Sequence, residues 1–126
     1  MLYTQLFALG ALGMVVGSFL GLLVLRVPKG QPVIFARSAC PYCGHQLRAS
    51  ELIPVASWIL QRRRCRACGS RLSIFYPVVE LSAAAVSIAA GLKLHGLWII
   101  AGCVGGWLLL ALAAWGWSRT HPQATL

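Results

Sequence analysis

Residues 40–69 read CPYCGHQLRASELIPVASWILQRRRCRACG, and this stretch decides how the rest of the chain is organised. It contains two Cys-x-x-Cys knuckles separated by 21 residues, and a glycine follows each knuckle at once. Each knuckle presents two thiolates on one side of a tight turn, so two knuckles can complete a tetrahedral cage of four sulfurs around zinc. The separation is just beyond the usual range for such a site. The cysteines are Cys40, Cys43, Cys65 and Cys68, and the glycines are Gly44 and Gly69.

Outside this stretch the chain has the composition of a membrane protein. Hydrophobic residues make up 59% of the 126 residues and charged residues only 10%, whereas ordinary soluble domains contain about 25% charged residues. A soluble core of this size cannot bury so much apolar surface. The excess must therefore face lipid.

Three apolar runs are long enough to cross a bilayer as helices. They are Leu6–Leu25, residues 77–94 and Leu97–Trp117. The second run begins at Pro77, a residue suited to the first turn of a helix. We expect Glu80 in that first turn, where the positive helix end favours a carboxylate. No basic segment precedes the first run and no small-residue cleavage site follows it, so we expect a retained span.

Small residues recur at every fourth position in the first two spans, and a stripe of this kind lets another helix approach closely. Glycine is also simply common in membrane helices, so the pattern has a second explanation. The two sets are Gly13, Gly17 and Gly21, and Ala83, Ser87 and Gly91.

The segment between the first two spans is polar, basic and rich in turn-forming residues. Pro32–Phe35 and Arg71–Phe75 have the composition of short strands. Leu52–Leu60 is apolar and predicts a short helix on the membrane face, because a tryptophan such as Trp58 is favourable at headgroup depth.

Charge predicts the orientation of the spans. Nine of the eleven Lys and Arg residues lie between Arg26 and Arg71, and the net charge is +9. By the positive-inside rule, residues 26–76 and the C-terminus are cytoplasmic, and the N-terminus and the 93–96 turn are outside. Lys93 opposes this orientation and Arg119 agrees with it. A basic surface is also typical of nucleic-acid binding. Because the basic residues are concentrated between two apolar spans, we attribute them to membrane topology and expect no nucleic-acid partner.

A cytoplasmic location of the loop argues against disulfide bonds between its cysteines. Disulfides need an oxidising compartment, and a thioredoxin-like redox site needs a βαβ pattern that the chain lacks. We therefore favour structural zinc, with His45 as an alternative ligand. Cys103 lies within the third span, where a thiol behaves as a small apolar side chain.

The motifs in these segments resemble the N-terminal part of bacterial type IV prepilin peptidases, enzymes that also methylate the pilins they cut. The resemblance covers about residues 10 to 90 and rests on several separated motifs in the family's order and spacing. These motifs are Gly17-Ser18-Phe19-Leu20, Arg26-Val27-Pro28, Cys40-Pro41-Tyr42-Cys43-Gly44-His45, Glu51, Ile53-Pro54, Ser57-Trp58, Arg62, Arg64-Cys65-Arg66-Ala67-Cys68-Gly69 and Tyr76-Pro77-Val78-Val79-Glu80-Leu81.

The spans and the resemblance together predict an all-α integral membrane protein of the bacterial inner membrane. It has three transmembrane helices, with a cytoplasmic four-cysteine zinc-knuckle loop between the first two. Residues 1–94 would form a prepilin peptidase N-terminal-like domain, comprising a helix at 4–26, the zinc loop at 27–76 and a helix at 77–94. Residues 95–126 would add the third helix and a short cytoplasmic tail.

The resemblance implies two activities, and the chain lacks residues for one of them. The family's peptidase uses two aspartates further along the chain. This sequence contains no aspartate, and Glu51 and Glu80 are its only acids. We expect no aspartyl peptidase activity from this polypeptide, because one carboxylate must hold a water and another must act as acid.

The second family activity is N-methylation of the new pilin N-terminus with S-adenosylmethionine. The resemblance implies that Glu80 or Glu51 binds a cation or accepts a proton, and that Arg26 and Tyr76 bind substrate or cofactor. A carboxylate at a membrane edge is a typical functional position. The simpler interpretations are a helix-start charge for Glu80 and a solvated loop residue for Glu51.

Three positions depart from the family pattern. Gly21 and Leu52 stand where asparagines are usual, and Phe75 stands where an arginine is usual. No glycine-rich nucleotide loop of the Rossmann kind is present. Three hypotheses therefore remain open: a methyltransferase-like module acting on prepilins or pseudopilins beside a separate peptidase, a non-catalytic membrane partner of a peptidase, or a truncated relative serving pilus assembly or type II secretion.

Overall fold

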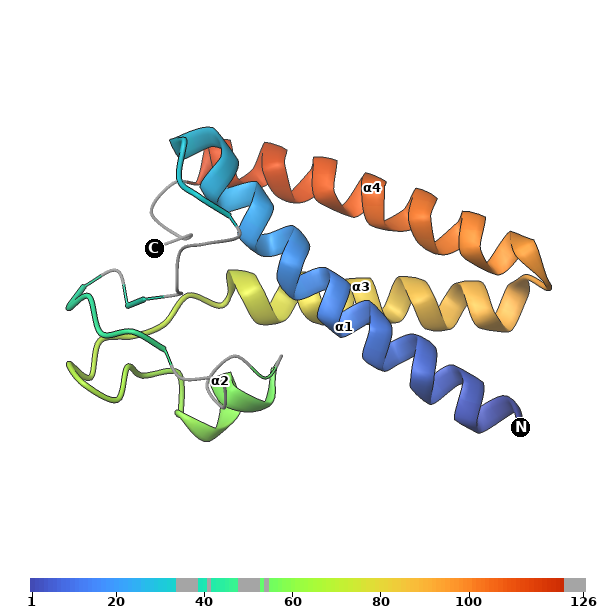
Figure 1. Ribbon diagram of the computed structural model, residues 1–126, viewed down its shortest axis with the longest axis horizontal. Coiled ribbons are helices and arrows are strands. Elements are labelled where there is room, and N and C mark those ends of the chain that lie inside the picture. The colour runs from blue at the N-terminus through green and yellow to red at the C-terminus, as the bar shows by residue number, and fades with distance from the viewer. Residues whose placement is uncertain (34–38, 41, 48–52, 54, 122–126) are drawn as a thin grey trace.

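The computed structural model describes the chain except for residues 34–38, 41, 48–52, 54 and 122–126. In the described part, three long helices are apolar enough to cross a membrane, as the sequence predicts. They are α1 (Leu2–Arg26), α3 (Phe75–Lys93) and α4 (Leu97–Thr120). Figure 1 shows α1 crossing the antiparallel pair formed by α3 and α4, with the intervening loop at one end of the three helices.

The described part of the loop contains little regular structure. A 3₁₀ turn, η1 (Val27–Lys29), follows α1, and the short helix predicted within Leu52–Leu60 is present as α2 (Ala56–Leu60). The strand expected at Arg71–Phe75 is wrong, because Arg71 makes one isolated bridge with Arg64 and Phe75 already begins α3. Of the other expected strand, Pro32 and Val33 are not in a strand, and its last two residues lie outside the described residues.

Helix α3 begins two residues before Pro77, which corrects the expected position of Glu80. The Ser73 hydroxyl accepts the Phe75 N–H at 3.2 Å, and the Val78 N–H reaches the Ile74 carbonyl at 3.1 Å. Proline is tolerated at the third helical position because N–H groups in the first turn have no partner within the helix. Glu80 is therefore the sixth residue of α3 and lies in its second turn.

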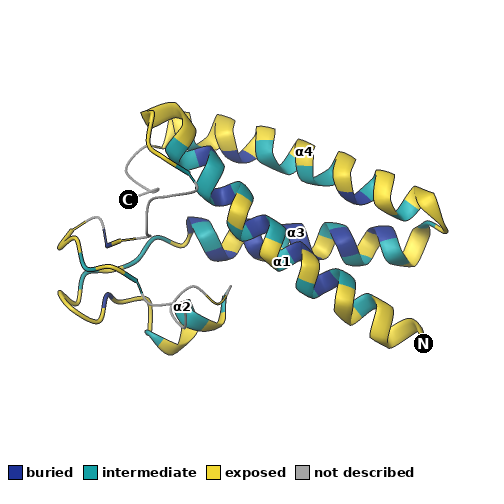
Figure 2. Cartoon of the chain, viewed as in Figure 1, coloured by how far each residue is buried: buried dark blue, intermediate teal, exposed yellow. Residues whose placement is uncertain are grey.

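The glycine stripe of α1 is the contact with α3. A Cβ atom at Gly17 would lie 2.7 Å from the Glu80 Cα, and one at Gly13 would lie 2.6 Å from the Ala83 carbonyl oxygen. Backbones this close require glycine, so the close-approach interpretation of the stripe is confirmed. In Figure 2 the buried residues gather along this contact, while the outer face of α4 is exposed.

A buried polar contact joins α4 to α3. The Ser87 side chain is fully buried and donates to the Ala83 carbonyl at 3.0 Å. The Trp107 indole N–H of α4 lies 3.2 Å from the Ser87 oxygen. At the loop end, Phe75 stacks on Trp117 with ring centroids 5.8 Å apart. The start of α3 and the end of α4 therefore meet beside the loop.

Candidate metal centre and membrane-edge site

The two knuckles have the same backbone hairpin. The Cys40 carbonyl accepts the Gly44 N–H at 2.9 Å, and the Cys65 carbonyl accepts the Gly69 N–H at the same distance. The two glycines have φ angles of +70° and +71°, a region that favours glycine. The chain thus builds one local structure twice and brings the two copies face to face.

The four knuckle sulfurs form a compact cluster. All lie within 4.8 Å of one another. The Sγ atoms of Cys40 and Cys68 are 3.8 Å apart, as are those of Cys43 and Cys65. Thiolates bound tetrahedrally at about 2.3 Å from zinc are separated by about 3.8 Å, whereas a disulfide needs about 2.05 Å. The donor set therefore fits a tetrahedral metal ion.

The local environment favours the thiolate, which is the metal-binding form, at Cys40 and Cys68 but not at Cys43. Burial acts to raise the pKa of Cys40, but hydrogen bonds from the Tyr42 and Cys43 backbone and the Ser70 side chain outweigh it and lower this pKa to about 6. The Ser70 hydroxyl lies 2.9 Å from the Cys68 sulfur and holds the pKa of Cys68 below its usual value. A backbone hydrogen bond from His45 acts to lower the pKa of Cys43, but burial and the neighbouring sulfurs outweigh it and raise this pKa to about 12. A metal ion must therefore displace the proton of Cys43, whereas Cys40 and Cys68 lose theirs more readily.

A second cluster lies where the loop meets α1 and α3. The Glu80 side chain is only 5% exposed, and one of its carboxylate oxygens accepts the Val55 N–H at 2.7 Å. The Ser18 side chain of α1 also hydrogen-bonds this carboxylate. Val55 has a φ of +56°, which is rare for a β-branched residue and marks local strain. Glu80 therefore ties the start of α2 to both spans.

The same region contains two more of the predicted site residues. Tyr76 is close enough to Arg26 and Glu80 to experience both charges, and the Arg26 guanidinium donates to the Pro32 carbonyl at 3.1 Å. The structure thus brings Arg26, Tyr76 and Glu80 together at the loop end of the spans. Glu51 lies outside the described residues.

The comparisons with known proteins agree with this architecture. Residues 11–94 match the sequence profile of the bacterial peptidase A24 N-terminal domain. The chain belongs to this family. No solved structure matches it significantly.

Relatives of this A24-family chain are known as prepilin leader peptidase/N-methyltransferases. The protein from Myxococcus xanthus is 51% identical over 70 residues, covering 56% of this chain and 21% of the relative. That from Bacillus subtilis is 40% identical over 81 residues, which cover 64% of this chain and 33% of the relative. The Dichelobacter nodosus protein is 32% identical over an alignment of 135 residues, which covers 85% of this chain and 47% of the relative. The chain thus spans less than half the length of these relatives.

Two departures from the family pattern can be placed in the structure of this A24 domain. Gly21 lies against the Tyr76 ring, where an added Cβ would be 3.3 Å from a ring carbon. Phe75 is buried and packs on Trp117. A small residue and an apolar ring thus stand beside the Tyr76–Glu80 cluster, where the resemblance implies an asparagine and an arginine. Leu52 lies outside the described residues.

The hydrogen-bond partners of Glu80 could not be predicted from the sequence of this domain. Nothing in the sequence indicated that Val55, 25 residues away, would donate to its carboxylate. Ser18 carried a weak signal, because it is a polar residue beside the glycine stripe in an otherwise apolar run.

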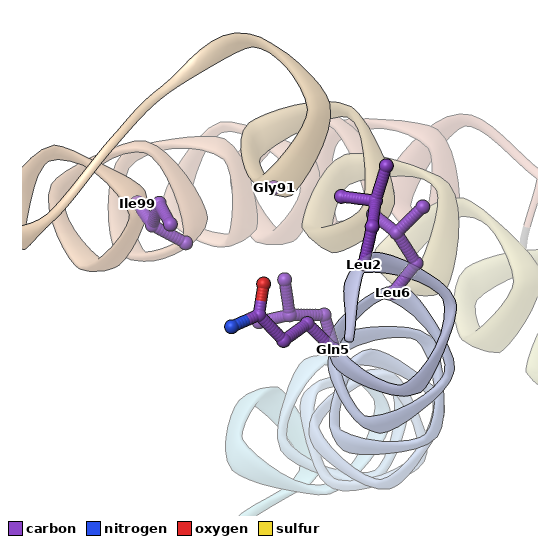
Figure 3. Close-up of a pocket in the computed structure, with 6 residues that line it drawn as sticks. Leu2, Gln5, Leu6, Gly91 and Ile99 are labelled. Carbon is purple, nitrogen blue, oxygen red and sulfur yellow. The ribbon is translucent and has the colours of Figure 1, made fainter.

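A cavity of about 220 Å³ lies at the other end of the spans (Figure 3). It is lined by Leu2, Gln5, Leu6, Leu9, Gly91 and Ile99, between the N-terminal part of α1 and the α3–α4 hairpin. Its lining includes none of the predicted site residues.

Proposed function

We propose that the chain is an inner-membrane module of the prepilin peptidase family that N-methylates prepilin or pseudopilin N-termini with S-adenosylmethionine. The observation that carries the proposal is the position of Arg26, Tyr76 and Glu80 at the loop end of the spans, where Tyr76 and Glu80 of α3 pack on Gly21 and Gly17 of α1 and Arg26 ends α1. The 126 residues contain no aspartate, so the proposal assigns these residues no aspartyl peptidase activity.

The proposal gives the four cysteines a structural role. One zinc ion bound by Cys40, Cys43, Cys65 and Cys68 would brace the loop at 27–76 within a domain of residues 1–94. Residues 95–126 would add the third span and a cytoplasmic tail. The positive-inside rule supports an N-terminus outside and a loop in the cytoplasm.

The chemistry assigns a task to each residue of the cluster. The pilin N-terminal amine attacks in its neutral form, and its ordinary pKa of about 7.7–8.0 makes that form available. S-adenosylmethionine, when bound, supplies an electrophilic methyl group on a cationic sulfur. Glu80 would hold the amine and take the proton that it loses on methylation, while Tyr76 and Arg26 would orient the reactants. Glu51 is proposed as a second carboxylate from the loop.

Methyl transfer tests the proposal directly. Purified chain is incubated with labelled methyl donor and a peptide bearing the free N-terminus of a cleaved pilin. The Glu80→Gln variant keeps an oxygen that can accept the Val55 N–H but loses the charge. We expect its methyl transfer to fall by about 10²- to 10⁴-fold, the usual contribution of a general acid–base group, with metal content unchanged.

One observation favours a second candidate, a non-catalytic membrane partner of a prepilin peptidase. The Glu80 carboxylate already bonds Val55 and lies against Ser18, so its role could be wholly structural. This candidate predicts no label transfer by the native chain and no donor binding by calorimetry. Transfer that is unchanged in Glu80→Gln would instead remove Glu80 from the mechanism.

A further inference from the structure

Helix α2 presents an apolar edge to the surroundings. The side chains of Ile59 and Leu60 are 60% and 79% exposed, and Ile53, just before the helix, is 52% exposed. Exposed aliphatic side chains grouped in this way mark an interaction surface.

The depth of α2 indicates what covers this edge. Val55, which caps the start of α2, donates to Glu80, the sixth residue of α3. At a rise of 1.5 Å per residue, Glu80 lies about 7.5 Å inside the start of that helix. The backbone of Val55 therefore lies beside the first two turns of α3. For a span that crosses the bilayer from Phe75, this puts the start of α2, and the apolar edge that follows it, at the depth of the lipid interface.

Arginines follow the apolar edge directly and are held against it. Arg62 and Arg63 have φ angles of +49° and +61°, and their N–H groups bond the carbonyls of Ile59 and Trp58 at 2.9 and 3.1 Å. The Arg63 guanidinium lies 5.2 Å from the centroid of the Trp58 ring. These bonds fix the exposed arginines to the same element as the apolar side chains.

The charge of this region is compensated only in part, since a zinc ion held by four thiolates carries two negative charges. Residues 26–71 hold nine Lys and Arg and a single acid, Glu51. The carboxylate among the described residues, Glu80, is buried and engaged with Val55. An apolar edge at interfacial depth beside clustered arginines is the arrangement with which peripheral helices bind anionic bilayers.

We propose that α2 and the Arg62–Arg64 turn, here called the α2 edge, form a binding surface for anionic phospholipid. Ile59 and Leu60 enter the acyl boundary, and Arg62, Arg63 and Arg64 bind headgroup phosphates. The occupant is the lipid of the bilayer that the three spans cross. The inference is independent of methyl transfer and goes beyond it. It assigns the loop a contact with lipid, in addition to its hydrogen bond with Glu80 of α3.

The experiment measures lipid preference in the full chain. The protein is reconstituted in nanodiscs containing equal parts of phosphatidylcholine and phosphatidylglycerol, and lipids retained after release are counted by native mass spectrometry. The test variant is Arg62→Gln with Arg63→Gln. The matched control is Lys93→Gln with Arg119→Gln, which removes the same charge from two exposed helix ends. In the control, Arg119 lies over Trp115 as Arg63 lies over Trp58.

We expect the native chain to retain phosphatidylglycerol preferentially and to lose this preference as salt is raised. A basic residue near an anionic surface contributes about fivefold in affinity, so the preference should fall by about 5- to 25-fold in the test variant. The control should change it less than the test variant does, because Lys93 and Arg119 lie singly at two different span ends and are not grouped on one edge. Arg62→Lys with Arg63→Lys should restore the preference.

Three results would overturn the proposal. The first is a native chain that retains the two phospholipids equally. The second is an equal loss of phosphatidylglycerol preference in the test and control variants, which would show an effect of net charge only. The third is a dimer mass that disappears in the test variant, which would show that the edge binds a second copy. Metal content equal to that of the native chain verifies that each variant is folded.

Discussion

Two groups of side chains mark the tip and the base of the loop. Four cysteine sulfurs cluster at its tip, and Glu80 accepts the Val55 N–H at its base. The sulfur pairs at 3.8 Å have the spacing of a tetrahedral thiolate site. Cys103 is also buried but lies in α4, away from this cluster. The five cysteines therefore divide into four with a predicted ligand role and one with a packing role.

Removal of one knuckle thiol should abolish metal binding. We expect Cys43→Ser to reduce the bound zinc from one per chain to near zero, because three thiolates leave an open coordination position. The Cys103→Ser variant should retain one zinc per chain. Elemental analysis of freshly purified, reduced protein makes the comparison, and equal metal content in the two variants would contradict the assignment.

The Glu80 carboxylate should control the opening of α2. Hydrogen bonds to charged groups contribute about 1.5–3 kcal/mol, so Glu80→Ala should accelerate amide exchange in residues 55–61 by about 10- to 100-fold. Glu80→Gln retains an acceptor and should change exchange much less. Hydrogen-exchange mass spectrometry measures both variants, and identical exchange in Glu80→Ala and native protein would show that the bond to Val55 does not hold the loop.

At the scale of elements, hydropathy predicted the three spans correctly, and small-residue spacing predicted a close helix contact without identifying α3 as the partner. These features depend on local composition and on a period of four residues, which the sequence displays directly. The start of α3 was misplaced because Pro77 was assumed to occupy the first helical position, whereas helical bonding extends back to Ile74. The strand expected at Arg71–Phe75 failed because the knuckle hairpin and α3 take up those residues.

The candidate site was harder to predict than the spans. The cysteine cluster followed from spacing because each knuckle is a local structure. The bond between Val55 and Glu80 joins residues 25 positions apart, and no periodic pattern records such a contact.

The glycine stripe should be intolerant of larger side chains. We expect Gly17→Leu to destabilise the helix bundle by about 1–3 kcal/mol, as overpacking does, because its Cβ would lie 2.7 Å from the Glu80 Cα. Gly105→Leu is the control, since open space surrounds that position within 4 Å. Thermal unfolding in detergent should show a lower midpoint for Gly17→Leu alone. An equal shift in both variants would mean that the stripe is not the packing contact.

For the whole molecule, charge distribution predicts that the loop and C-terminus are cytoplasmic. Cysteines introduced one at a time in a Cys103→Ser background that keeps the four knuckle cysteines test this orientation, with the labelled position located by peptide mass spectrometry. A membrane-impermeant thiol reagent applied to intact spheroplasts should label His95→Cys in the turn after α3 and should not label Thr120→Cys at the end of α4. Labelling of Thr120→Cys without labelling of His95→Cys would show that the orientation is the opposite of the predicted one.

The central claim for the whole molecule is that a four-thiolate metal centre braces a loop, and that this loop is held over the ends of membrane spans. X-ray absorption at the zinc edge tests it most directly on the purified full chain. The account predicts one zinc per chain with four sulfur neighbours at about 2.3 Å and no nitrogen neighbour. A mixed sulfur and nitrogen shell, which would bring in His45, or a chain that binds no zinc when reduced, would contradict it.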